Sequence, residues 1–303
     1  MSNFTVTLLG VRGGFPVPGP QTVEFGGNTT CLEVHAGPHL IIIDAGTGII
    51  DLGKRLVAQY ARDRRPITGT MLFTHSHHDH TQGLPFFVPL RMTDSRFDIL
   101  GPRIADEHIK YILEQVMQPS LFPIKLEQLA AVRKIHVVQS SDVILLLEPG
   151  APSMVQDLAC ETAPFPSHAV QIRMHHSVRH PKGGTMCYRI EYMGRSVVFA
   201  TDTEGYEGGD TKLIRFAQGA DLLIHDSEYT DDEYTGPPFA HQGWGHSTWR
   251  MAIDVGKKAE VKRLILTHHN ARHNDAFMRE VEREATAVFA RASMAREGMT
   301  IEL

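Results

Sequence analysis

The stretch THSHHDHTQG, residues 74–83, packs four histidines and one aspartate into six consecutive positions. Of the chain's 18 histidines, 12 gather at 75–80, 175–180, 241–246 and 268–273. Neutral imidazole is the commonest side-chain ligand of metal ions. Three imidazoles and one carboxylate converging on a point suit zinc or a similar borderline ion. The spacing HxHxDH therefore predicts a metal site rather than a solvated polar turn.

The direction of each side chain in this stretch separates ligands from bystanders. Residues two apart share a side where a segment leaves a strand, so His75, His77 and Asp79 are expected to point together. His78 then points away and binds nothing. His80 rejoins the first set if the chain turns into a helix. We therefore expect four ligands and one bystander here.

Further ligands must come from distant segments. In MHHSVRHPKGG we favour His180, because its Pro/Gly-rich loop can approach a metal, over His175 and His176, which continue a strand. Asp202 ends the buried strand of VVFATDTEG and can bridge two cations, although a capping or turn role is an equal alternative. His268 follows the buried strand LILT, and His269 is its weaker competitor.

The elements that must position these residues alternate between strands and helices. The segments 69–80 and 261–273 look related, since each is a buried strand that ends in Thr-His. Equivalent strand ends meet at one edge of an open α/β sheet, so both should reach the same crevice. Strands are expected at 4–10, 31–36, 40–45, 70–74, 136–139, 143–147, 170–175, 222–225, 263–267 and 299–303, with two more within 186–200. Helices are expected at 50–62, 105–117, 126–132, 211–218, 247–258 and 275–291.

Composition narrows the class of protein. With 303 residues, 42% hydrophobic and 21% charged, the chain is expected to form a single globular domain over 1–303. The net charge of −5 provides no general attraction for nucleic acid. Three widely spaced cysteines without a CxxC pair fit a reducing cytoplasm. No apolar run is long enough to span a membrane, so no membrane partner is expected.

The motif set resembles the metallo-β-lactamase fold superfamily over almost the whole chain, from FTVTLLGVRGG to LILTHHN. LLIHDSEY at 222–229 and GHST at 245–248 are similar to the paired loops of its ribonuclease Z and cyclic-phosphate phosphodiesterase branch. The resemblance implies an α/β fold, a four-layer αββα sandwich with the site at one sheet edge. It also implies two divalent metal ions, for which we favour zinc over manganese or iron. One metal is assigned His75, His77 and His180, the other Asp79, His80 and His268, with Asp202 bridging.

The same resemblance assigns catalytic roles. His246, oriented by Asp226, is our candidate proton donor to the leaving alkoxide, the alternative being a residue packed beside the helix cap. Asp79 is counted with the catalytic residues as well as the ligands. Asp44 in IIIDAGTG is expected to hydrogen-bond a ligand histidine, or else to be a plain turn residue. Arg12 either reaches a substrate phosphate or, as we favour, is an exposed loop arginine.

These assignments predict a dinuclear metal-dependent hydrolase, a phosphodiesterase for a cyclic or short nucleotide-like diester. Large nucleic acid is not the expected partner, because the long basic Gly/Pro-rich arm of ribonuclease Z has no counterpart and Asp226 stands where that family has glutamate. The alternatives are a thioester or lactam hydrolase, a ribonuclease Z-like RNA 3′ endonuclease, and a metal-bound sensing module. LPFFVPL at 84–90 is expected to wall the site or to pack two copies as a homodimer.

Overall fold

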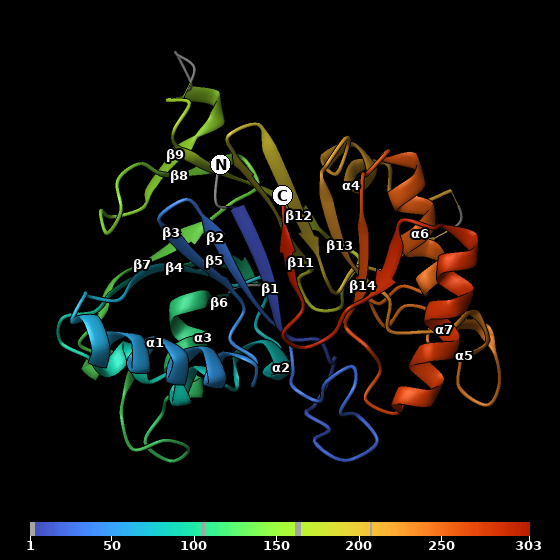
Figure 1. The fold of residues 1–303 in the computed structure, drawn as a ribbon, viewed down its shortest axis with the longest axis horizontal. Helices are drawn as coiled ribbons and strands as arrows, with labels where there is room; N and C mark the ends of the chain where they lie inside the picture. Colours follow the sequence, from blue (N-terminus) through green and yellow to red (C-terminus); the bar gives the residue numbers. More distant parts are fainter. Residues whose placement is uncertain (1–3, 105–106, 161–164, 207) are drawn as a thin grey trace.

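The computed structural model describes residues 4–104, 107–160, 165–206 and 208–303. Its strands form two mixed sheets that lie face to face, and its longer helices cover their outer faces (Figure 1). The first strand, Phe4–Gly10, pairs in antiparallel fashion with the last strand, Thr300–Glu302. The expected αββα sandwich is confirmed.

The first sheet combines antiparallel amino-terminal strands with parallel strands that lead towards the histidine-rich stretch. β1 and β2 pair in antiparallel fashion, as do β2 and β3, whereas β3, β4, β5 and β7 run parallel. In spatial order the strands are β16 (Thr300–Glu302), β1 (Phe4–Gly10), β2 (Cys31–Ala36), β3 (His39–Ile43), β4 (Thr68–Leu72), β5 (Arg96–Ile104) and β6 (Glu107–His108), with β7 (Val132–Val138) also pairing with β5.

The second sheet has the same mixture of directions. Its β12, β13, β14 and β15 run parallel, and the remaining neighbours are antiparallel. In spatial order the strands are β15 (Ala292–Met294), β14 (Leu264–Thr267), β13 (Leu222–Asp226), β12 (Arg195–Ala200), β11 (Thr185–Tyr192), β10 (Val170–Ser177), β8 (Asp142–Leu146) and β9 (Met154–Asp157).

Three hydrophobic cores hold the layers together, because each sheet is apolar on both faces. The central core lies between the sheets and includes Leu8, Ile41 and Phe199. The other two lie between each sheet and its helices. The helices are α1 (Ile49–Asp63), α2 (His78–Thr81), α3 (Ile109–Val116), α4 (Thr211–Phe216), α5 (Asp231–Thr235), α6 (Trp249–Lys258) and α7 (Asp275–Val288). The 3₁₀ turns are Leu84–Phe86, Val88–Arg91, Leu126–Gln128 and Leu158–Cys160.

Most of the strands and helices expected from the sequence are present, and one predicted helix is wrong. The helix expected at 126–132 is a single 3₁₀ turn, because the chain re-enters the sheet at Val132 and pairs with Phe97 in β5. The helix expected at 105–117 begins at Ile109, and residues 105 and 106 lie outside the described residues. Asn274 caps α7, since its side chain accepts a hydrogen bond from the backbone amide of Phe277. The strands β5, β6, β9 and β15 and the helix α5 were not expected.

The apolar stretch 84–90 serves the core beneath the first sheet. Leu84, Phe87 and Leu90 are buried there, and the exposed Phe86 meets Phe122 edge to face. The residues that line the cavity beside the histidines come from other segments. The stretch therefore does not line this cavity, one of the two roles that the sequence left open; the other, packing two copies as a homodimer, stays a prediction. Within the described ranges, no helix combines the length and apolar character needed to cross a membrane.

Candidate metal centre

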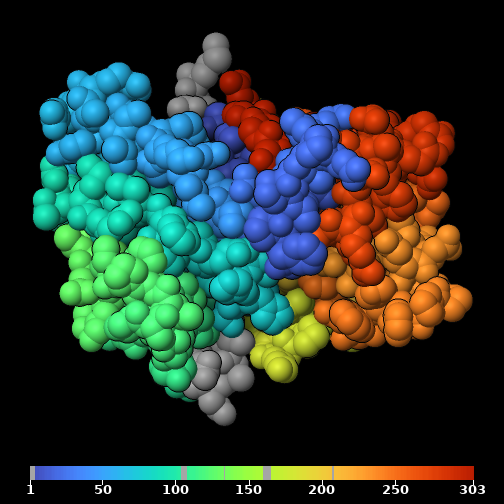
Figure 2. All heavy atoms as spheres, turned by 90° about the horizontal axis from the view of Figure 1, so that it is seen from below, coloured from blue at the N-terminus to red at the C-terminus, as the bar shows by residue number. Residues whose placement is uncertain are grey.

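The functional side chains gather at one edge of the sandwich, where several parallel strands end. His75 follows β4, Asp202 follows β12 and His268 follows β14. Seen from this edge, the segment near residue 180, in yellow, lies between the teal and green segments of the amino-terminal half and the orange segments of the carboxyl-terminal half (Figure 2). The two Thr-His strand ends at 74–75 and 267–268 therefore meet in one crevice, as predicted.

The first group of potential ligands consists of His75, His77, His180 and Asp202. One ligand atom of each lies within 4.8 Å of the others. Nε2 of His180 is 2.9 Å from Nδ1 of His77, and Nε2 of His75 is 3.5 Å from Oδ1 of Asp202. Three imidazoles and a carboxylate oxygen thus converge on one point, which is the donor set that zinc takes.

The second group consists of Asp79, His80 and His268. Oδ2 of Asp79 lies 3.3 Å from Nε2 of His80 and 3.3 Å from Nε2 of His268. Asp79 lines the same cavity as His77, but its carboxylate faces His80 and His268 rather than the first group. Helix α2 begins at His78 and turns the carboxylate towards His268, in agreement with the division that the resemblance implied.

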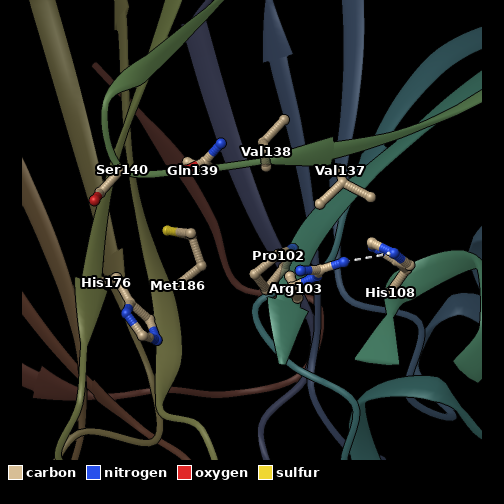
Figure 3. A pocket seen from close by; sticks show the side chains of 9 residues that line it. All are labelled: Pro102, Arg103, His108, Val137, Val138, Gln139, Ser140, His176 and Met186. Atoms are coloured by element: carbon tan, nitrogen blue, oxygen red, sulfur yellow. Dashed lines mark hydrogen bonds between the residues drawn. The ribbon is translucent and has the colours of Figure 1, made fainter. Parts of the chain in front are cut away.

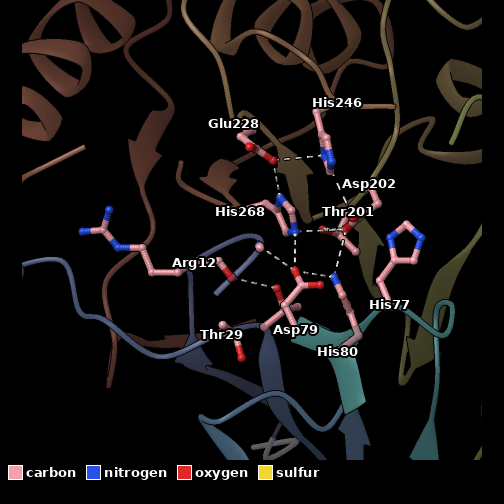
Figure 4. Close-up of polar contacts among 12 residues, drawn as sticks. Arg12, Thr29, His77, Asp79, His80, Thr201, Asp202, Glu228, His246 and His268 are labelled. Atoms are coloured by element: carbon pink, nitrogen blue, oxygen red, sulfur yellow. Dashed lines mark hydrogen bonds and ion pairs between the residues drawn. The ribbon is translucent and has the colours of Figure 1, made fainter. Parts of the chain in front are cut away.

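Asp202 lies between the two groups and presents one oxygen to each (Figure 4). Its Oδ1 faces His75, while its Oδ2 is 3.3 Å from Nε2 of His80 and 3.3 Å from Nε2 of His268. The backbone of Asp202 has a positive φ of 52°, an uncommon conformation for a residue other than glycine. Its amide donates a hydrogen bond to Asp226 at 3.0 Å, so the turn is held in place.

The chemistry of the donors fits divalent metal ions. Nε2 of His75 and Nε2 of His80 are buried without a hydrogen-bond partner. Burial lowers the pKa of His75 well below its usual range and that of His77 to about 4, which favours the neutral imidazole that metals bind. Burial also opposes the charged form of His80, but Asp79 and Asp202 raise its pKa well above the usual value. The same carboxylates would stabilise a bound cation.

His246 forms a third element of the site, with two carboxylates on one ring nitrogen. Nδ1 of His246 lies 2.8 Å from Oδ2 of Asp226 and 3.4 Å from Oε2 of Glu228. Burial alone would lower the pKa of His246, but these carboxylates raise it to about 9. The ring stacks on His268 with centroids 4.9 Å apart. His246 also lies close enough to Asp202 and His268 for the three side chains to bind one metal ion together.

Glu228 is the residue that sequence reasoning missed. It joins His246 to His268, because its Oε2 also lies 3.2 Å from Nδ1 of His268 (Figure 4). The signal was present in the sequence, since Glu228 lies two residues after Asp226 and residues two apart share a side of an extended segment.

Close backbone packing holds the ligand rings. A side chain at Gly13 would come within 2.3 Å of the ring of His268, and the Gly13 position therefore needs glycine. Gly245 has a φ of 92°, and its carbonyl accepts a hydrogen bond from Nδ1 of His180 at 3.2 Å. On the other side, Gly14 donates its amide to Asp79 at 2.9 Å.

The structure also places the histidines that the sequence left as bystanders or as competing metal ligands. His78 is exposed beside the cluster and belongs to neither group, which agrees with its expected role as a bystander. His269 is buried, and its Nε2 donates a hydrogen bond to the carbonyl of Ala295 at 2.9 Å, away from the ligand atoms. His175 stacks obliquely on Phe216. Ligation by His180 and His268 rather than these neighbours stays a prediction that the geometry favours.

Arg12 fits neither of its expected roles. Its side chain is fully buried and donates to the carbonyls of Gly26, Asn270 and His273. Burial lowers its pKa. Arg12 therefore ties the amino-terminal loop to the segment after His268 and does not reach a substrate.

Several cavities lie on the described part of the chain, and one of about 520 Å³, beside residues 16–22 and 271–274, contains none of the ligand residues. Two others compete as the place where a substrate would bind. One of about 470 Å³ lies where β5 and β7 approach β10 and β11, and its lining includes Arg103, His108 and His176 (Figure 3). It contains neither ligand group. The other, of about 330 Å³, opens directly onto Asp79, Asp202, His246 and His268, and we assign the site to it. Its remaining lining residues are Gly13, Gly14, Phe15, His77, Glu228, Tyr229, His241, Trp244, Asn270, Ala271 and Arg272.

Comparison with known proteins places this arrangement in a family. The model of the beta-lactamase superfamily domain matches residues 39–269. A ribonuclease Z from Synechococcus sp. (strain CC9311) is 27% identical over 328 aligned residues, covering 98% of this chain and 98% of that protein.

Solved structures share the fold at lower identity. The metallo-beta-lactamase fold protein YhfI from Bacillus subtilis superposes with a TM-score of 0.67 at 18% identity, covering 99% of this chain and 100% of that one. A diphosphatase of the PhnP family superposes with a TM-score of 0.62 at 17% identity, covering 99% of this chain and 98% of that one. These two likenesses establish the fold alone.

Proposed function

The chain belongs to the beta-lactamase superfamily, and on that premise we propose that it is a dinuclear metal-dependent phosphodiesterase acting on a cyclic or short nucleotide-like diester. The observation that carries the proposal is the pair Asp226–His246 beside two donor groups that share Asp202. Two adjacent cations and a proton donor can together catalyse hydrolysis of a phosphodiester, because the cations stabilise the attacking and leaving oxygens and the donor protonates the leaving group.

In this proposal, His75, His77 and His180 would hold one metal, Asp79, His80 and His268 would hold the other, and Asp202 would be shared between them. Zinc is favoured because imidazole predominates among the ligands, with manganese and iron as alternatives. When bound, such cations supply Lewis-acid chemistry, which activates water and neutralises charge on a phosphoryl group.

His246 would protonate the leaving oxygen. Its Nδ1 is engaged by Asp226, so Nε2 is the nitrogen left for the substrate. The two carboxylates at Nδ1 favour the protonated ring and orient it. A lactam or thioester hydrolase would have no need for this pair, and a sensing module would not need the open cavity beside it. Both therefore rank below the phosphodiesterase.

A second candidate is an RNA 3′ endonuclease like ribonuclease Z. The alignment with the Synechococcus ribonuclease Z over nearly the full length of both chains favours it. The net charge of −5 and the small cavity favour a short diester instead. The two activities need the same metals and the same proton donor, so substrate size alone separates them.

Initial rates on a panel of substrates test the proposal. Metal-replete protein, prepared with zinc or with manganese, is assayed on bis(p-nitrophenyl) phosphate, 2′,3′- and 3′,5′-cyclic nucleotides, a precursor transfer RNA, a β-lactam and a thioester. We expect turnover of small diesters that D202A abolishes. Absence of turnover on every diester would refute the proposal, and cleavage of the RNA with no small diester cleaved would favour the second candidate.

A further inference from the structure

A large aromatic ring stands open to solvent in the wall of the ligand cavity. Trp244 lines the cavity together with His246, yet its surface is 58% exposed. Phe15 lines the same cavity and is also 58% exposed. Burial of such rings is strongly favourable, so their exposure beside the site points to a partner that covers them.

The loop that carries Trp244 is held in one conformation. The amides of Gly243 and Gly245, on either side of the tryptophan, donate to the carboxylate of Glu204 at 2.6 and 2.9 Å. The Trp244 amide donates to the carbonyl of His241 at 3.2 Å. These bonds fix the backbone immediately before and after the exposed ring.

Two neighbouring aromatic rings pack on one side of the tryptophan. His241 meets Trp244 edge to face, with centroids 5.1 Å apart, and Tyr229 stacks on His241 at 4.5 Å. Nδ1 of His241 donates to the carbonyl of Glu233 at 2.6 Å. The indole therefore contacts His241 on one side and is exposed to solvent on the other. Arg272, with an exposed guanidinium, lines the same cavity and offers positive charge to a phosphate.

We infer that Trp244 is the surface on which a nucleobase of the substrate stacks, and that it sets the preference for nucleotides over base-free diesters. The inference rests on the proposed function, which it deepens. Every nucleobase has a flat π face, and stacking on an aromatic side chain contributes roughly five- to a hundredfold in affinity for each base. The ring lies in the same cavity as the ligand groups, so a base bound there leaves its phosphate within the site.

Phe239 provides a matched control. It lies in the same loop region and is 76% exposed, but it is not among the residues that line the cavity. If exposed aromatic rings in this loop act only through non-specific hydrophobic contact, F239A and W244A should change the substrate preference to the same extent.

The kinetic test compares two five-membered cyclic diesters that differ in the base, adenosine 2′,3′-cyclic phosphate and glycerol 1,2-cyclic phosphate. We expect wild-type protein to prefer the nucleotide in kcat/KM by roughly ten- to a hundredfold, mainly through KM. W244A should lower this ratio towards one, because kcat/KM falls far more on the nucleotide than on the glycerol diester. W244F should retain most of the ratio, and F239A should not change it. An equal loss on both substrates in W244A would overturn the inference.

A binding test separates this inference from the proposed function. The chain has two tryptophans, and Trp249 is only 3% exposed, so quenching by a stacked base reports on Trp244. Adenosine 5′-monophosphate should quench wild-type fluorescence to saturation and leave W244F unchanged. Saturable quenching without turnover of any diester would sustain the inference and refute the proposed function. Absence of quenching, or quenching that persists in W244F, would overturn the inference.

Discussion

Nδ1 of His80 lies 2.8 Å from Oδ2 of Asp44, and both side chains are fully buried. Asp44 also accepts hydrogen bonds from the backbone amide and the hydroxyl of Thr74, each at 2.8 Å. The carboxylate therefore joins the strand end before the histidine-rich stretch to one of its ligand rings. This bond fixes the ring so that Nε2 faces Asp202. The role expected for Asp44 from its sequence context agrees with this geometry.

Replacing Asp44 with asparagine should weaken the second metal. Loss of a carboxylate behind a ligand histidine typically lowers metal affinity by 10- to 100-fold. Asparagine tolerates the positive φ of 60° at this position, so the fold should survive. Competition with a chelator measures the affinity, and D51N, at an exposed position of α1, serves as the control. Unchanged affinity in D44N would contradict the role of the pair.

Substitutions in the two ligand groups should change metal content in different ways. H180A should lower the stoichiometry from two ions to about one, because only the first group loses a donor. D202A should affect both ions, since its two oxygens face different groups. H78A, at the exposed neighbouring histidine, should keep both. Elemental analysis after zinc repletion measures these outcomes, and a single ion in the wild-type protein would refute the dinuclear assignment.

Removal of His246 should affect substrates according to their leaving groups. General acids typically contribute 10²- to 10⁴-fold, and a leaving alkoxide needs the proton far more than p-nitrophenolate does. H246A should therefore lose about this factor in kcat on a cyclic nucleotide and little on bis(p-nitrophenyl) phosphate, with metal content unchanged. Equal losses on both substrates together with a lower metal content would show instead that His246 is a ligand.

The pair Glu233–His273 should make stability depend on acid pH. Burial would raise the pKa of Glu233, but hydrogen bonds from His273, at 2.6 Å, and from Thr230 lower it from the ordinary 4.5 to about 2. Because the folded-state pKa lies below the unfolded value, the stabilisation is complete above about pH 4.5 and is lost as the pH falls towards 2.

E233Q tests this dependence. At pH 6 the variant should have a lower free energy of unfolding than wild type, by roughly 1 to 2 kcal/mol given the partial exposure of the carboxylate. The difference should shrink at pH 3. Urea unfolding at both pH values measures it, and any metal loss in acid affects both proteins and cancels in the difference. A gap that stays constant with pH would contradict the assignment.

Several features of the site follow from the sequence without the structure. The spacing HxHxDH after a buried strand predicts the local donors, because strand geometry and the start of a helix set their directions. The repeated Thr-His strand ends predict a shared crevice, since parallel strands end at one edge of a sheet. His180 and Asp202 could be favoured from their loop and strand-end positions, and the family resemblance supplied the layers of the fold.

Other features depended on how distant segments pack. Asp79 turned to His268 because helix α2 starts one residue before it, a boundary that the local spacing does not define. Arg12 is buried because its carbonyl partners Asn270 and His273 arrive from the other end of the chain. The exposure of Trp244 beside the ligand groups likewise arises from contacts between loops. Such distances are set by the packing of two sheets and their helices, and only the tertiary structure decides them.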